Sequence, residues 1–143
     1  MTAPGRINLF VYGTLRRGQY NDRGLTDLAL DIVRNVVVDG AMFNVQGQLP
    51  IYPVVDFDQP GTVHGDILVG LPLGDDIVEG VMLMERGAGY EAREVQTHVL
   101  TDGPVIGFHQ DSTRGGLGVR ITDGDWLRFD MTAQPSPWPW NRR

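Results

Sequence analysis

The chain has 143 residues, of which 41% are hydrophobic and 21% charged, as in a single soluble globular domain spanning residues 1–143. Its net charge is −6 and all its positive side chains are arginines, so it offers no basic stripe for nucleic acid. The absence of cysteine excludes disulfides, a thiolate nucleophile and cysteine-ligated metals.

The first predicted element is a strand at residues 9–12. Four apolar residues run into Gly13 without polar alternation, which indicates a strand buried on both faces. It ends at Tyr12-Gly13-Thr14, where glycine permits a positive φ or a close approach to a bound group. Successive N–H groups at such a turn can form a small nest for an anion or a carbonyl, although an ordinary strand-to-loop turn fits the same residues.

The middle of the chain predicts further short elements. Residues 16–22 predict a loop, and residues 25–34 a short helix. A strand follows over 36–45, interrupted at Asp39-Gly40, and then a loop over 46–58 with an extended piece at Val54-Val55. Residues 63–69 predict a strand in which Gly65 allows two backbones to approach closely.

The second half predicts one clear helix and more strands. The helix begins at Asp75 or Asp76 and stops at Gly87 and Gly89, and its apolar face comprises Ile77, Val78, Val81, Met82 and Met84. A strand over 90–100 returns as a hairpin at 105–109, and a polar loop over 111–118 precedes a last strand at 125–129. Residues 134–143 form a Pro/Trp-rich tail. This inventory predicts an α+β fold, a small, mostly antiparallel β-barrel with one or two short helices.

Membrane and metal functions find no support in the sequence. No apolar run approaches the length of a membrane span, and the N-terminus lacks a signal-peptide pattern, so a cytoplasmic location is expected. His64, His98 and His109 lie far apart without a ligand spacing, so no metal site is expected.

Several short segments resemble those of a known family. The run Val11-Tyr12-Gly13-Thr14-Leu15-Arg16 with a glycine soon after, the segment from Tyr90 through Arg93 to Val95, and Asp123-Gly124-Asp125-Trp126 occur in a consistent order. Together they resemble the gamma-glutamylcyclotransferase-like family, in its bacterial type, over residues 7–130.

The resemblance implies which residues act. The backbone of Tyr12, Gly13, Thr14 and Leu15 would hold the glutamyl part of the substrate, and the Tyr90 phenol would bind the substrate's carboxylate. A glutamate at the end of the helix would be the catalytic acid and base, and we assign this role to Glu85.

Glu85 departs from the family's Leu-Asp-x-x-Glu-Gly pattern. Met82 stands where the aspartate would be, and Arg86 separates Glu85 from Gly87. The run Asp76–Gly80 matches the pattern better by letter, but Glu79 follows Pro72 so closely that barely one turn of helix precedes it. Glu85 allows the full helix and lies nearer to Tyr90, so we favour it over Glu79.

The implied activity is a cyclotransferase that converts a gamma-glutamyl amine or amino acid to 5-oxoproline plus the free amine. It would need no cofactor and no metal, and its partner would be a small-molecule gamma-glutamyl substrate, not nucleic acid or a membrane. The leaving group could be an amino acid, a peptide or a polyamine, and a homodimer is compatible with the sequence. Two alternatives are a non-catalytic small-molecule-binding protein on the same fold and an interaction protein that uses the tryptophan-bearing tail.

Overall fold

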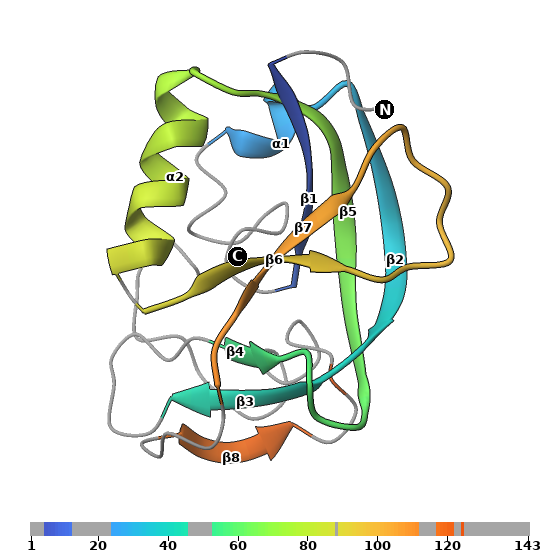
Figure 1. The fold of residues 1–143 in the computed structure, drawn as a ribbon, viewed down its shortest axis with the longest axis vertical. Helices are drawn as coiled ribbons and strands as arrows, with labels where there is room; N and C mark the ends of the chain where they lie inside the picture. Colours follow the sequence, from blue (N-terminus) through green and yellow to red (C-terminus); the bar gives the residue numbers. More distant parts are fainter. Residues whose placement is uncertain are drawn as a thin grey trace, which may run out of the picture.

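Two β-sheets and one long helix make up the fold (Figure 1). The computed structural model describes residues 5–12, 24–45, 53–87, 89–111, 117–121 and 124. The elements are, in chain order, β1 Arg6–Val11, α1 Leu25–Leu28, β2 Asp31–Asp39, β3 Ala41–Val45, β4 Pro53–Asp56, β5 Thr62–Pro72, α2 Asp76–Gly87, β6 Glu91–Val95, β7 Val105–His109 and β8 Leu117–Ile121.

The larger sheet has the strand order β2-β5-β1-β7-β6, and the smaller has the order β4-β3-β8. All neighbouring strands are antiparallel except β1 and β7, which pair in parallel. The mixed α+β class and the mostly antiparallel pairing are therefore confirmed. Among the described strands the sheets do not close on themselves, because β2 and β6 end the larger sheet without pairing to each other. Within the described residues, the expected barrel is therefore a pair of open sheets.

Strand β1 lies at the centre of the larger sheet. Its last four residues, Asn8 to Val11, are each at most 1% exposed, as expected of a strand covered on both faces. On one side it pairs with β5, where a Cβ on Gly65 would overlap the carbonyl oxygen of Val11 and the ring of Phe10. The close approach predicted at Gly65 is confirmed.

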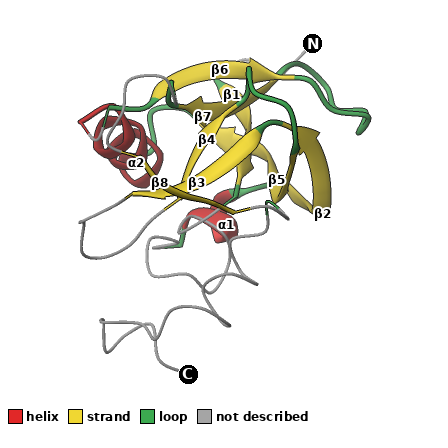
Figure 2. Ribbon diagram, turned by 90° about the horizontal axis from the view of Figure 1, so that it is seen from below, coloured by secondary structure: helices red, strands yellow, loops and turns green. Residues whose placement is uncertain are grey.

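Helix α2 and strand β2 lie on opposite sides of the molecule in both views (Figure 2). The helix is amphipathic, and its buried residues are Val78, Val81 and Glu85, spaced three and four residues apart on one face. Ile77, which we expected on that face, is 40% exposed. The buried stripe thus carries an acidic side chain at its C-terminal end.

Three predicted boundaries are wrong. The helix expected over 25–34 is a single turn, Leu25–Leu28, because the chain becomes extended at Ala29 and β2 begins at Asp31. The strand expected over 90–100 ends at Val95, and Leu100 beyond it is 98% exposed. Residues 117–121, partly assigned to a polar loop, form strand β8 on the edge of the smaller sheet.

The predicted loop over 16–22, the predicted strand over 125–129 and the tail over 134–143 lie outside the described residues. Within the described part of the chain, no helix combines the length and the apolar character needed to cross a bilayer.

Candidate active site

The buried stripe of α2 brings a carboxyl group into the protein interior. Glu85 is 9% exposed, and it follows Val81 by one turn on the same face. Burial raises the pKa of Glu85 to about 7, because the charged carboxylate loses its contact with water. A carboxyl group with this pKa can both accept and donate a proton near neutral pH.

Tyr12 lies within the electrostatic reach of Glu85. Its ring is 6% exposed at the end of β1, and its hydroxyl donates a 2.9 Å hydrogen bond to the carbonyl oxygen of Phe108 in β7. Burial, and next the negative charge of Glu85, raise the pKa of Tyr12 well above its usual value, while hydrogen bonds with the Val55 backbone and the Tyr90 side chain oppose that rise. The charge of Glu85, near the end of α2, therefore acts on a phenol that directly follows β1.

Tyr90 completes this cluster. It is 7% exposed, and its backbone N–H donates a 3.0 Å hydrogen bond to the carbonyl oxygen of Glu85. Its ring lies edge-on to Phe108, with the centroids 6.4 Å apart. Because the Tyr12 hydroxyl donates to Phe108, the Tyr90 hydroxyl is the donor in the bond between the two phenols. A hydrogen bond thus joins the two buried phenols, and the charge of the buried Glu85 carboxylate acts on Tyr12.

Glu79 lies elsewhere. It is exposed in the first turn of α2, and its carboxylate accepts a 3.3 Å hydrogen bond from the backbone N–H of Gly74. A carboxylate near a helix N-terminus is favoured by the helix dipole, so this position has a purely local explanation. Gly13, Thr14 and Leu15 lie outside the described residues, and Tyr12 is the one member of that predicted loop whose structure is described.

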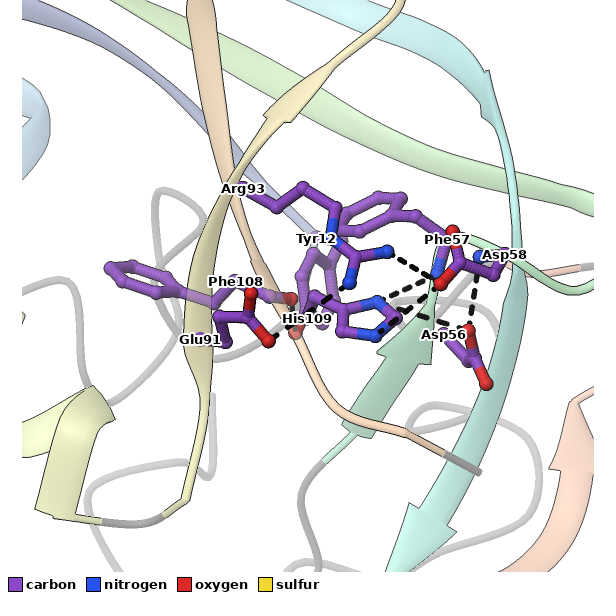
Figure 3. A network of polar contacts seen from close by, with 8 residues as sticks. All are labelled: Tyr12, Asp56, Phe57, Asp58, Glu91, Arg93, Phe108 and His109. Carbon is purple, nitrogen blue, oxygen red and sulfur yellow. Dashed lines mark hydrogen bonds and ion pairs between the residues drawn. The ribbon is translucent and has the colours of Figure 1, made fainter. Parts of the chain in front are cut away.

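A second group of polar side chains lies where the ends of β4 and β7 meet, a neighbourhood that no sequence pattern predicts (Figure 3). Asp56, Asp58 and His109 place potential metal-ligand atoms within 4.8 Å of one another. The exposed carboxylate of Asp58 also pairs with Arg93 at 2.6 Å. No motif signals this group, because His109 lies about 50 positions from the two aspartates and only the fold brings them together.

The hydrogen bonding of His109 does not fit a metal ligand. Its Nδ1 accepts a 3.1 Å hydrogen bond from the backbone N–H of Phe57, so Nδ1 carries no proton and the neutral ring holds its proton on Nε2. A metal on Nε2 would need the proton on Nδ1, facing the Phe57 N–H, and a metal on Nδ1 would displace that bond. The cluster therefore suits a histidine that accepts a hydrogen bond at Nδ1.

Comparisons with known proteins agree on one fold. The family described as "Gamma-glutamyl cyclotransferase, AIG2-like" matches residues 9–128. The uncharacterized protein PH0828 from Pyrococcus horikoshii is 21% identical, with a TM-score of 0.62 over 87% of this chain and 93% of its own.

Two bacterial structures are similar to the same extent. The protein c4763 from uropathogenic E. coli is 21% identical, with a TM-score of 0.64 over 89% of this chain and 97% of its own. YkqA from Bacillus subtilis is 22% identical, with a TM-score of 0.64 over 88% of this chain and 41% of its own. A search among curated proteins gives no match. At these identities the structures establish the fold alone.

Proposed function

Because the chain belongs to the gamma-glutamyl cyclotransferase, AIG2-like family, we propose that it converts a gamma-glutamyl amine or amino acid to 5-oxoproline and the free amine. The α-nitrogen of the glutamyl group attacks its own γ-carbonyl carbon and closes a five-membered ring. The bond from that carbon to the leaving nitrogen then breaks. One proton leaves the attacking nitrogen and one joins the leaving nitrogen, so the reaction consumes no water and needs no redox partner.

The observation that carries this proposal is the Glu85 carboxyl group. It is buried, its pKa is raised to about 7, and it interacts electrostatically with Tyr12. An ionised Glu85 takes the proton from the attacking nitrogen, and the resulting acid gives it to the leaving amine. One carboxyl group with a pKa near the working pH can perform both transfers in sequence.

The rest of the task is positioning. Holding the glutamyl chain in a folded conformation makes the attack intramolecular, and well-oriented reactions of this kind gain large effective molarities. We propose that backbone N–H groups of Tyr12, Gly13, Thr14 and Leu15 hold the glutamyl group and stabilise charge on its γ-oxygen. The buried ring of Tyr12, bonded to Phe108, would anchor the start of that loop.

Tyr90 is proposed to bind the substrate's carboxylate through its hydroxyl. In the structure this hydroxyl bonds to Tyr12 instead, and both rings are buried. Substrate binding would therefore exchange the bond between the phenols for a charge-assisted bond from Tyr90 to the carboxylate.

A product analysis tests the proposal. The protein is incubated with a panel of gamma-glutamyl amides, including amino-acid, peptide and polyamine derivatives, and the products are identified by mass. We expect 5-oxoproline and the free amine from at least one member, and none from an analogue acylated on the α-nitrogen. Release of glutamate would indicate a hydrolase and contradict the mechanism, whereas no product from any member would favour a binding protein on this fold.

A further inference from the structure

The hydroxyl of Tyr12 lies where the two sheets meet. It donates to the carbonyl oxygen of Phe108 in β7, a strand of the larger sheet, at 2.9 Å. Its other backbone partner is Val55 in β4, a strand of the smaller sheet. The position of this phenol therefore depends on the spacing between β4 and β7.

Two hydrogen bonds join the ends of these strands beside the phenol. The N–H of Gln110, the residue after β7, donates to the carbonyl oxygen of Val55 at 2.9 Å. The N–H of Phe57, the residue after β4, donates to Nδ1 of His109 at 3.1 Å. In the first bond the acceptor is a backbone carbonyl oxygen, and in the second it is the imidazole nitrogen of His109.

Ring contacts connect His109 with Tyr12 through Phe57. His109 is 4% exposed and stacks on Phe57, with ring centroids 6.1 Å apart and planes 23° apart. Phe57 in turn meets the ring of Tyr12 edge-on, with centroids 6.5 Å apart. Figure 3 shows His109, Phe57 and Tyr12 gathered between the strands.

We propose that His109 is a positioning residue for Tyr12. Its unprotonated Nδ1 accepts the N–H of Phe57, which holds the end of β4 beside the end of β7 and so fixes the Tyr12 hydroxyl between Phe108 and Val55. Through Tyr12 it sets the electrostatic interaction with Glu85 and the hydrogen bond with Tyr90. The consequence for turnover rests on the proposed function, but the consequence for the Tyr12 phenol does not.

Two substitutions separate the hydrogen bond from the bulk of the ring. His109→Asn places a side-chain oxygen at the same number of bonds from Cβ as Nδ1, so it can still accept from Phe57 while losing the ring. His109→Leu keeps a similar volume and removes the acceptor, leaving the part-buried N–H of Phe57 without that partner. The same two substitutions at His98, which is exposed, are the matched controls.

Nuclear magnetic resonance of the full chain gives the first readout. In the Leu variant we expect the Phe57 amide to exchange at least about tenfold faster and the Tyr12 Cζ signal, assigned with Tyr12→Phe, to move. The Asn variant and both His98 variants should keep the wild-type signals. A Leu variant with unchanged Phe57 and Tyr12 signals, or an Asn variant as altered as the Leu variant, would overturn the proposal.

Two further measurements keep the test decisive. In the wild-type protein at about pH 8, the nitrogen resonances of the His109 ring should show that Nδ1 carries no proton. A proton on Nδ1 would contradict the proposed hydrogen bond from Phe57 without the need for any variant. With an active gamma-glutamyl amide, kcat should fall roughly tenfold in the Leu variant and recover in the Asn variant. If the wild-type protein releases no 5-oxoproline, the proposed function fails, while the Phe57 and Tyr12 signals still decide the role of His109.

Discussion

At the scale of single residues, the period of α2 decides which carboxylate enters the interior. Val78, Val81 and Glu85 share the buried face, whereas Glu79 lies one residue beyond Val78 and is therefore rotated toward water. Burial holds the pKa of Glu85 near 7 instead of in the usual acidic range. The two glutamates on one helix thus form a natural pair of test and control.

Glu85→Gln should remove turnover while leaving ligand binding intact. Glutamine keeps the shape of the side chain but cannot act as a base, so kcat should fall by about 10² to 10⁴. Because the ionised form is the base and its pKa is about 7, wild-type kcat should rise with pH and reach half its maximum near that value. The assay follows 5-oxoproline release across pH.

Glu79→Gln is the control for that experiment. It also removes a carboxylate from α2, but from an exposed position at the other end of the helix. We expect its kcat and pH profile to match the wild type. Lost turnover in Glu79→Gln together with normal turnover in Glu85→Gln would reverse the assignment.

Glu85→Gln should also change the free energy of unfolding, by an amount that depends on pH. The folded protein binds the Glu85 proton more tightly than the unfolded chain does, so its stability falls as pH rises from the usual carboxyl range through about 7. Glutamine removes this loss, and Glu85→Gln should raise the free energy of unfolding by up to about 3 kcal/mol above that pH. Denaturant titrations at several pH values measure the difference. A gap that does not shrink on acidification would contradict the burial of an ionisable Glu85.

The positions of some of these residues could be predicted from the sequence, and those of others could not. Glu85 could be placed because a helical period and a glycine stop define one end of α2. His109 could not, because its partner is the backbone N–H of Phe57, 52 residues away, and no side-chain pattern records a bond to a backbone group. The sequence predicts Tyr90 as a substrate ligand, but its bond to Tyr12 depends on how α2 turns into β6.

At the scale of elements, local patterns predicted the strands that carry β-branched runs. Val36–Val38 and Val63–Val69 lie in β2 and β5, and the break at Asp39-Gly40 is the point where the chain leaves the larger sheet for the smaller. Strand β8 was not predicted, because its sequence, LGVRI, is short and follows a glycine-rich stretch. It forms because β3 offers an edge, with Met42 opposite Ile121, and this is tertiary information.

Two glycine substitutions test this account of the elements. Gly65→Ala would push a methyl group against the Val11 carbonyl and the Phe10 ring, where β5 packs on the central strand, and should lower the free energy of unfolding by about 2 kcal/mol. Gly80→Ala meets nothing within 4 Å on the exposed face of α2 and should raise it by about 0.5–1 kcal/mol. Thermal and denaturant unfolding measure both. Equal effects at the two sites would contradict the close approach at Gly65.

At the scale of the whole molecule, the strand order depends on contacts distant in sequence. The buried side chain of Asn8 donates to the carbonyl oxygen of Asp102 at 3.2 Å and accepts from the N–H of Gly70 at 3.0 Å, so it ties β1 to both neighbouring segments. Such a bond fixes the parallel pairing of β1 with β7, which no hairpin connection could bring about. The sequence predicted the class of fold, but the order of strands and the open sheets follow from these long-range pairings.

This topology predicts how the molecule opens. Strand β1 has partners on both sides, and β5 pairs with β1 and β2. Among the described strands β6 pairs with β7 alone, and α1 is a single turn. Amides that depend on the two central strands can exchange only when the whole sheet separates, while an edge strand or a short helix can open by itself.

In native-state hydrogen exchange, the bonded amides of β1 and β5 should therefore be the slowest. Their exchange free energies should fall steeply with denaturant and approach the global free energy of unfolding, and those of α1 and β6 should be smaller and nearly independent of it. If the amides of β6 or α1 prove to be the slowest, β1 and β5 are not the stable centre of the fold.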